Sequence, residues 1–189
     1  MLFLVLGLLL FLGIHTTAIL GLREPAVARL GEGPWKGLYS LISFVGLGLI
    51  VWGYGQARMD PTFLWIPPRG VKHLALALML PVFPMLFAAY LPGRIQTRLK
   101  HPMLAGVKLW ALAHLVANGT VADLLLFGGV LAWAVADRIS LKRRPVVREI
   151  PMAPPTALND VLAVGLGLLT YGLFVGGLHT WLIGVPPIP

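Results

Sequence analysis

Residues 37–57 read GLYSLISFVGLGLIVWGYGQA, an unbroken run that contains no charged side chain. A transmembrane helix needs about 20 mainly apolar residues, because the hydrocarbon core of a bilayer is about 30 Å thick and a helix rises about 1.5 Å per residue. The run therefore predicts a membrane-spanning helix. Further runs of the same character lie on both sides of it, at residues 2–22, 72–91, 102–118, 121–137 and 158–183.

The composition agrees with a membrane protein. Of the 189 residues, 58% are hydrophobic and only 12% are charged, whereas soluble domains carry about 25% charged residues. We therefore predict an all-α, polytopic transmembrane helical bundle of about six helices, with residues 1–189 forming a single domain. The membrane lipids are then expected to be partners of this bundle.

The connections between the runs are short and rich in helix breakers, such as Glu32-Gly33-Pro34. Only Asn118-Gly119-Thr120 separates the fourth run from the fifth, and Asn-Gly favours a turn. A tight hairpin of these two helices is expected; one long kinked helix would far exceed a bilayer's thickness. The connection at residues 138–155 is too polar and too proline-rich to span. Gly172-x-x-x-Gly176 fits a helix-packing pattern, but 22 glycines produce such matches by chance.

The positive charges predict an orientation. The net charge of +8 is spread between the apolar runs, as expected of loops beside anionic lipid and not of a nucleic-acid-binding surface. One side of the predicted bundle holds Arg23, Arg29, Lys36, Arg94, Arg98, Lys100, Arg138, Lys142, Arg143, Arg144 and Arg148. The other side holds Arg58, Arg69 and Lys72. Since positively charged loops stay in the cytoplasm, both termini are predicted to be non-cytoplasmic.

The chain has no cysteine, which excludes disulfides, thiolate nucleophiles, iron–sulfur ligation and covalent haem attachment. The histidines become the main candidates for chemistry. With the first helix ending near Arg23, His15 lies roughly 12 Å from that end, and His114 lies roughly 18 Å from Pro102. Both are thus expected near the midplane, on different helices.

Two interpretations of this pair remain open. The histidines can form interhelical hydrogen bonds, or they can be the two axial ligands of a haem inside the bundle. In the second case Trp110 and Asn118, one turn to either side of His114, are candidate neighbours of the cofactor. Asn118 or Asp123 could accept the free imidazole N–H; Asp123 could equally be an ordinary boundary residue.

The other candidates are less central. Lys108 is predicted to extend its side chain so that the ammonium group reaches the membrane surface, or to form an ion pair with a carboxylate or a haem propionate. His179 stays an alternative ligand, whereas His73 and His101 occupy ordinary interfacial positions.

Several separated motifs carry a family resemblance. They are Gly13-Ile14-His15, Leu22-Arg23, Leu38-Tyr39-Ser40-Leu41, the segment 46–54, Lys100-His101-Pro102, the segment 110–115, Asn118-Gly119 and the segment 179–185. The chain resembles the NnrU family of bacterial membrane proteins, which is named for an association with nitrite and nitric oxide metabolism. That family is similar to the plant 15-cis-ζ-carotene isomerase, a haem b membrane enzyme.

The resemblance implies a bacterial inner (cytoplasmic) membrane location, non-covalent haem b, and His15 and His114 as iron ligands. A cysteine proposed as an alternative ligand in the isomerase has no equivalent here, and Thr120 replaces an acidic residue of NnrU relatives. Isomerase activity therefore does not follow from the resemblance.

Two kinds of function are expected. One is a haem b protein that serves nitrogen-oxide metabolism, or that isomerises a polyene lipid in a redox-linked reaction. The other is a non-enzymatic accessory or assembly subunit of a respiratory or nitrogen-oxide reductase complex. A transporter is less well supported, because no internal repeat is evident. The oligomeric state is not predicted.

Overall fold

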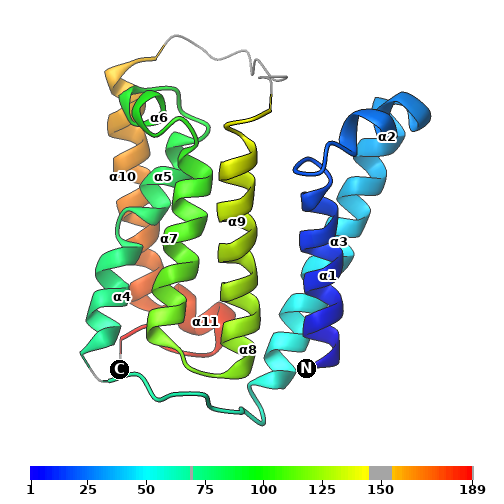
Figure 1. Ribbon diagram of the computed structural model, residues 1–189. Helices are drawn as coiled ribbons and strands as arrows, with labels where there is room; N and C mark the ends of the chain where they lie inside the picture. Colours follow the sequence, from blue (N-terminus) through cyan, green and yellow to red (C-terminus); the bar gives the residue numbers. More distant parts are fainter. Residues whose placement is uncertain (69, 145–154, 189) are drawn as a thin grey trace. The chain divides into compact units, whose positions relative to one another are not determined.

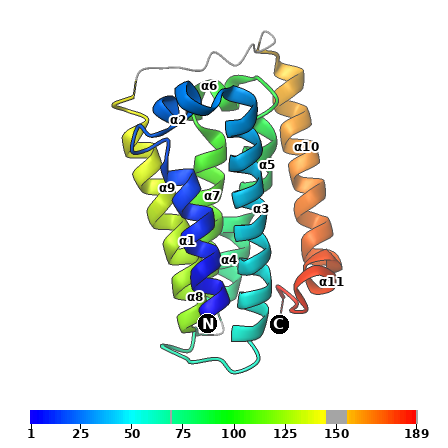
Figure 2. The same ribbon diagram turned by 90° about the vertical axis from the view of Figure 1, so that its right-hand side faces the viewer.

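The computed structural model describes residues 1–68, 70–144 and 155–188. The described residues form helices and no β-strand, with an isolated bridge between Phe63 and Thr120 (Figures 1 and 2). The prediction of an all-α protein is thus confirmed. The chain divides into two compact units, Met1–Ile66 with Gly119–Pro145 and Pro67–Asn118 with Val146–Pro189, and each unit is described by itself.

Unit 1 is built on a pair of helices that touch through glycine. Its helices are α1 (Leu2–Thr16), α2 (Arg23–Leu30), α3 (Glu32–Ala57), α8 (Val121–Asp123), the π-helix η1 (Leu124–Gly128) and α9 (Gly129–Ser140). The backbones of α1 and α3 approach so closely that a Cβ on Gly46 would lie 2.8 Å from the Phe11 nitrogen, and one on Gly7 would lie 2.6 Å from the Ile50 nitrogen. Small residues permit such contacts between membrane helices.

Unit 2 is held by a second close pair. Its helices are α4 (Val71–Met79), α5 (Val82–Ala88), α6 (Arg94–Leu99), α7 (Pro102–Ala117), α10 (Ala157–Leu173), the π-helix η2 (Phe174–Leu178) and α11 (His179–Ile183). A Cβ on Gly167 of α10 would lie 2.6 Å from the Pro84 Cα of α5. The Tyr171 hydroxyl donates to the Leu76 carbonyl at 3.1 Å, which joins α10 to α4.

Three described helical segments are long and apolar enough to cross a membrane: Glu32–Ala57, Val71–Ala88 and Ala157–Ile183. Leu2–Thr16 and Pro102–Ala117 are apolar but shorter. Many large apolar side chains are exposed, among them Phe44 (75%) and Trp181 (80%). A bilayer solvates such a surface, whereas soluble proteins rarely expose it.

Several predicted helix ends are wrong. The first helix ends at Thr16 and not at residue 22. At its end the Thr17 N–H bonds the Ile14 carbonyl, three residues back, and Gly21 turns the chain with φ +68°. The helix predicted at residues 37–57 is α3. It begins at Glu32, five residues before the predicted start, and includes the expected breaker Pro34. Proline is tolerated there because the N–H groups of a first turn have no intrahelical acceptor.

Two expected connections contain short helices, α2 and α6, which the apolar pattern did not reveal because both are rich in charge. The break at residues 118–120 is confirmed, since Asn118 and Thr120 are both extended. One long helix is thereby excluded. Most of the connection 138–155 lies outside the described residues, as do Arg69 and Arg148 of the orientation argument.

Candidate functional site

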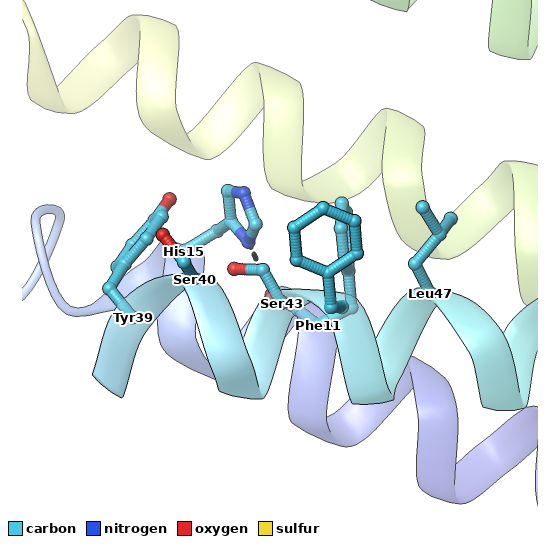
Figure 3. A pocket seen from close by; sticks show the side chains of 7 residues that line it. Phe11, His15, Tyr39, Ser40, Ser43 and Leu47 are labelled. Atoms are coloured by element: carbon cyan, nitrogen blue, oxygen red, sulfur yellow. Dashed lines mark hydrogen bonds between the residues drawn. The ribbon is translucent and has the colours of Figure 1, made fainter. Parts of the chain in front are cut away.

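His15 lies in the last turn of α1, in unit 1. The predicted depth of 12 Å is therefore wrong, since it assumed a helix that continues to residue 22. The Nδ1 atom of His15 is 2.6 Å from the Phe11 carbonyl oxygen. A carbonyl can only accept a hydrogen bond, so Nδ1 carries the proton and Nε2 of the neutral ring is left with its lone pair. Figure 3 shows the Nε2 side of the ring pointing away from this bond.

The His15 ring is surrounded by aromatic side chains. Its centroid lies 4.3 Å from that of Phe11 and 5.2 Å from that of Tyr39. The Trp133 ring of α9 meets it edge-on at 5.7 Å and 86°. The ring orientation of His15 is thus fixed by one hydrogen bond and three aromatic neighbours.

A groove of about 210 Å³ opens beside this ring. It is lined by Phe11, His15, Tyr39, Ser40, Ser43, Phe44 and Leu47 (Figure 3). Typical pockets for whole small molecules measure about 300–1,000 Å³, so this groove is large enough for part of a ligand of that kind.

Two buried polar atoms near His15 have no hydrogen-bond partner. They are Oγ of Ser43, which lines the groove, and Nε1 of Trp133. Buried polar groups are nearly always paired, and an exception calls for an explanation such as a missing ligand. These residues were not identified from the sequence. The available signal was the polar spacing of Tyr39, Ser40 and Ser43 on one face of an otherwise apolar helix.

His114 of unit 2 has the same local arrangement. Its Nδ1 donates to the Trp110 carbonyl at 2.8 Å, and the Trp110 and His114 ring centroids are 5.0 Å apart. The Nδ1–H of this imidazole is therefore accepted by a backbone carbonyl of its own helix. The Asn118 amide instead donates to the His114 carbonyl at 2.9 Å, at the end of α7.

Asp123 bonds to residues of unit 1 and is buried. It is only 4% exposed. It accepts a 2.5 Å bond from the Tyr54 hydroxyl and bonds from the Thr120 backbone N–H and hydroxyl at 2.9 and 2.6 Å. The carboxylate therefore joins α3 to the start of α8 within unit 1.

The remaining candidates are in unit 2. Lys108 is half-buried in α7. His179 begins α11, and its Nδ1 lies 2.6 Å from the Val185 carbonyl, which ties this helix to the segment beyond Gly184. All three candidate iron ligands thus have Nδ1 at a backbone carbonyl.

The tautomer of His15 is the one that an iron ligand needs. Among the described residues, no group of three or more His, Cys, Asp or Glu side chains could hold a metal ion. A haem needs only axial ligands, because the porphyrin supplies the other four nitrogens. Metal-binding imidazoles characteristically donate their second N–H to a carbonyl or carboxylate, as His15 and His114 do.

No curated protein and no solved structure matches the chain. A family model with the description NnrU protein matches residues 3–187, nearly the whole length. The motifs that include His15, Trp110, His114 and Asn118 all lie within the matched region. The chain therefore belongs to the NnrU protein family.

Proposed function

We propose that this protein is an integral membrane protein that binds haem b, which would be held by His15 and His114, with His179 as an alternative ligand. The observation that carries the proposal is the state of His15. Its Nδ1–H is held by the Phe11 carbonyl, and the residue lines a groove together with Ser43, whose hydroxyl is unpaired. In unit 2, Nδ1 of His114 likewise donates to a backbone carbonyl, that of Trp110.

The chain's own residues have defined tasks in this proposal. The carbonyls of Phe11 and Trp110 accept the Nδ1–H of the two imidazoles and so hold each ring in one tautomer. Phe11, Tyr39 and Trp133 fix the orientation of the His15 ring. When bound, haem supplies one-electron chemistry and an iron that acts as a Lewis acid. The role we propose is electron or nitric oxide handling for nitrogen-oxide metabolism, with redox-linked isomerisation of a polyene lipid as the second candidate.

The experiment is an absorption spectrum of the full chain in detergent, oxidised and reduced, with the haem quantified as its pyridine complex. We expect about one haem per chain with low-spin bands. His15→Ala and His114→Ala should each lose or shift these bands, while His73→Ala, which alters an exposed residue, should not. Full retention of haem in both variants would refute the ligand assignment. A protein that takes up no haem would leave the non-enzymatic accessory subunit of a respiratory complex as the better proposal.

We further propose six membrane spans in the bacterial inner membrane, with both termini outside the cytoplasm. The three long apolar helices support this, as do the two shorter ones and the continuous helix from residue 121 to residue 140. Because the chain has no cysteine, single cysteines can be introduced without a background. Glu24→Cys and Gln96→Cys should be protected from a membrane-impermeant maleimide in intact spheroplasts, and Asp60→Cys should react. The reverse pattern would overturn the orientation.

A further inference from the structure

Large apolar side chains are concentrated in the segment that follows α3 and lies outside any helix. Residues 58–66 of unit 1 leave the end of α3 as turns and extended chain (Figure 1). The exposed large apolar residues of this segment are Met59, Phe63, Leu64, Trp65 and Ile66. Ile66 is 82% exposed, and residues 61–68 contain no charged side chain. An apolar patch of this kind marks a surface that contacts either another protein or a membrane.

Backbone hydrogen bonds hold this loop against the turn that precedes α8. The Leu64 and Trp65 N–H groups both donate to the Gly119 carbonyl, at 2.8 and 3.2 Å. In the opposite direction, the Val121 N–H donates to the Thr62 carbonyl at 2.9 Å. A Cβ on Gly119 would lie 3.0 Å from the carbonyl carbon of Trp65 and closer still to its oxygen, so this approach requires glycine. The apolar side chains are therefore presented by a backbone of defined conformation.

The same contacts place the loop at the level of the end of α3. The Tyr54 hydroxyl, in the last turn of α3, bonds the carboxylate of Asp123. Asp123 is only two residues beyond Val121, so the loop that bonds to Val121 lies beside this last turn. Over residues 37–57, which carry no charge, α3 rises roughly 30 Å, which is about the thickness of the hydrocarbon core. With α3 across the membrane, the loop lies at the boundary between the hydrocarbon and the lipid headgroups.

Both the side chains and the backbone of the loop suit this boundary. Tryptophan is enriched at the level of the lipid headgroups, and Trp65 lies within the exposed apolar run. Unpaired backbone groups are costly inside a bilayer. The N–H groups of Leu64 and Trp65 are already paired with Gly119, so their entry into the membrane carries no such cost. These properties and the position of the loop favour lipid over a protein partner.

We propose that residues 63–66 are a lipid anchor, in which the side chains of Phe63 and Ile66 insert among the headgroups and the upper acyl chains of the phospholipids, while Asp60 stays in water. The anchor fixes the depth at which α3 ends and α8 begins, because the loop is bonded to the turn before α8 and Tyr54 is bonded to Asp123. The inference requires α3 to cross the membrane. It is independent of haem binding and of the orientation of the chain.

The test uses single cysteines in the full-length chain, which has none of its own. Phe63→Cys and Ile66→Cys are labelled with the fluorophore NBD and placed in phosphatidylcholine nanodiscs, where both membrane faces are accessible. One quencher is a phosphatidylcholine with a nitroxide near the headgroup end of its acyl chain, and the other is iodide in the buffer. The lipid quencher should reduce the emission at both positions, and iodide should leave it nearly unchanged.

Two control positions bracket the anchor. Asp60→Cys, in the exposed turn just before it, should respond to iodide and not to the lipid quencher. Val51→Cys, at a lipid-facing position of α3 that is exposed in this structure, should respond to the lipid quencher alone.

Each other outcome overturns a defined part of the inference. If iodide quenches Phe63→Cys and Ile66→Cys while Val51→Cys still responds to lipid, the loop lies in water and the anchor is refuted. Protection of both loop positions from both quenchers would show that protein covers the loop, which also refutes the anchor. Iodide quenching at Val51→Cys would refute the membrane crossing of α3 itself. A Phe63→Cys protein that does not fold leaves Ile66→Cys to decide, and the haem content of the samples bears on the proposed function alone.

Discussion

Replacing Gly53 by alanine is expected to push α1 away from α3. A Cβ at this position would lie 2.7 Å from the Phe3 carbonyl carbon and 2.8 Å from the Leu4 Cα, whereas ordinary contacts begin at 3.4 Å. Both atoms belong to the backbone of α1, so no side-chain rotation can relieve the clash. The helix itself must move by roughly 1 Å from a close-packed position.

The magnitude follows from two opposing effects. Overpacking of this kind costs about 1–3 kcal/mol. Alanine is a better helix former than glycine by about 0.8–1 kcal/mol. At Gly55, two residues along the same helix, a Cβ meets nothing within 4 Å, so only the second effect operates there. The free energies of unfolding of Gly53→Ala and Gly55→Ala should therefore differ by about 1–3 kcal/mol, with Gly55→Ala the more stable.

The assay is thermal unfolding in mild detergent, followed by far-UV circular dichroism. For a chain of this size a difference of 1 kcal/mol shifts Tm by about 2–4 °C. Gly55→Ala should unfold a few degrees above the wild type, and Gly53→Ala at or several degrees below it. Equal Tm values for the two variants would refute the close packing of α1 on α3. Gly46→Ala and Gly48→Ala form a second pair with the same contrast.

Two further predictions concern polar contacts that join helices. Tyr54→Phe removes the 2.5 Å hydrogen bond to Asp123 and should lower Tm by several degrees, through a loss of about 1.5–3 kcal/mol. Tyr90→Phe alters a residue that is 77% exposed and should leave Tm unchanged. Equal Tm values for the two variants would contradict a stabilising role of the Tyr54–Asp123 bond. Asp160→Ala removes the carboxylate that accepts from the Arg94 and Ile95 N–H groups at 2.9 and 3.0 Å. The amides of α6 should then exchange with deuterium faster by roughly fivefold, as for the loss of a helix cap worth about 1 kcal/mol. Asp60→Ala should not change that exchange, and unaltered protection of α6 in Asp160→Ala would show that the carboxylate does not cap it.

Only part of the candidate site could be predicted from the sequence. Spacing and residue type selected His15 and His114, and the family match includes both. The sequence suggested a side-chain acceptor for the His114 imidazole, whereas the structure shows a backbone carbonyl of the same helix at Nδ1 of each histidine. Ser43 and Trp133 were not selected, since the sequence does not indicate whether a serine or an indole in an apolar run finds a partner. That depends on which helices face each other.

Hydropathy and helix breakers in the sequence by themselves determined the helical class, the approximate places of the apolar helices and the break at residues 118–120. These properties are local, because a run of apolar residues has the same preference for lipid whatever surrounds it. Tertiary structure decided which glycines matter. Gly7, Gly46 and Gly53 meet a facing backbone, whereas Gly172 and Gly176 have open space, as their discounted motif implied. It also decided that Asp123 bonds Tyr54, since residues 69 positions apart in the chain meet only when the helices that carry them pack together.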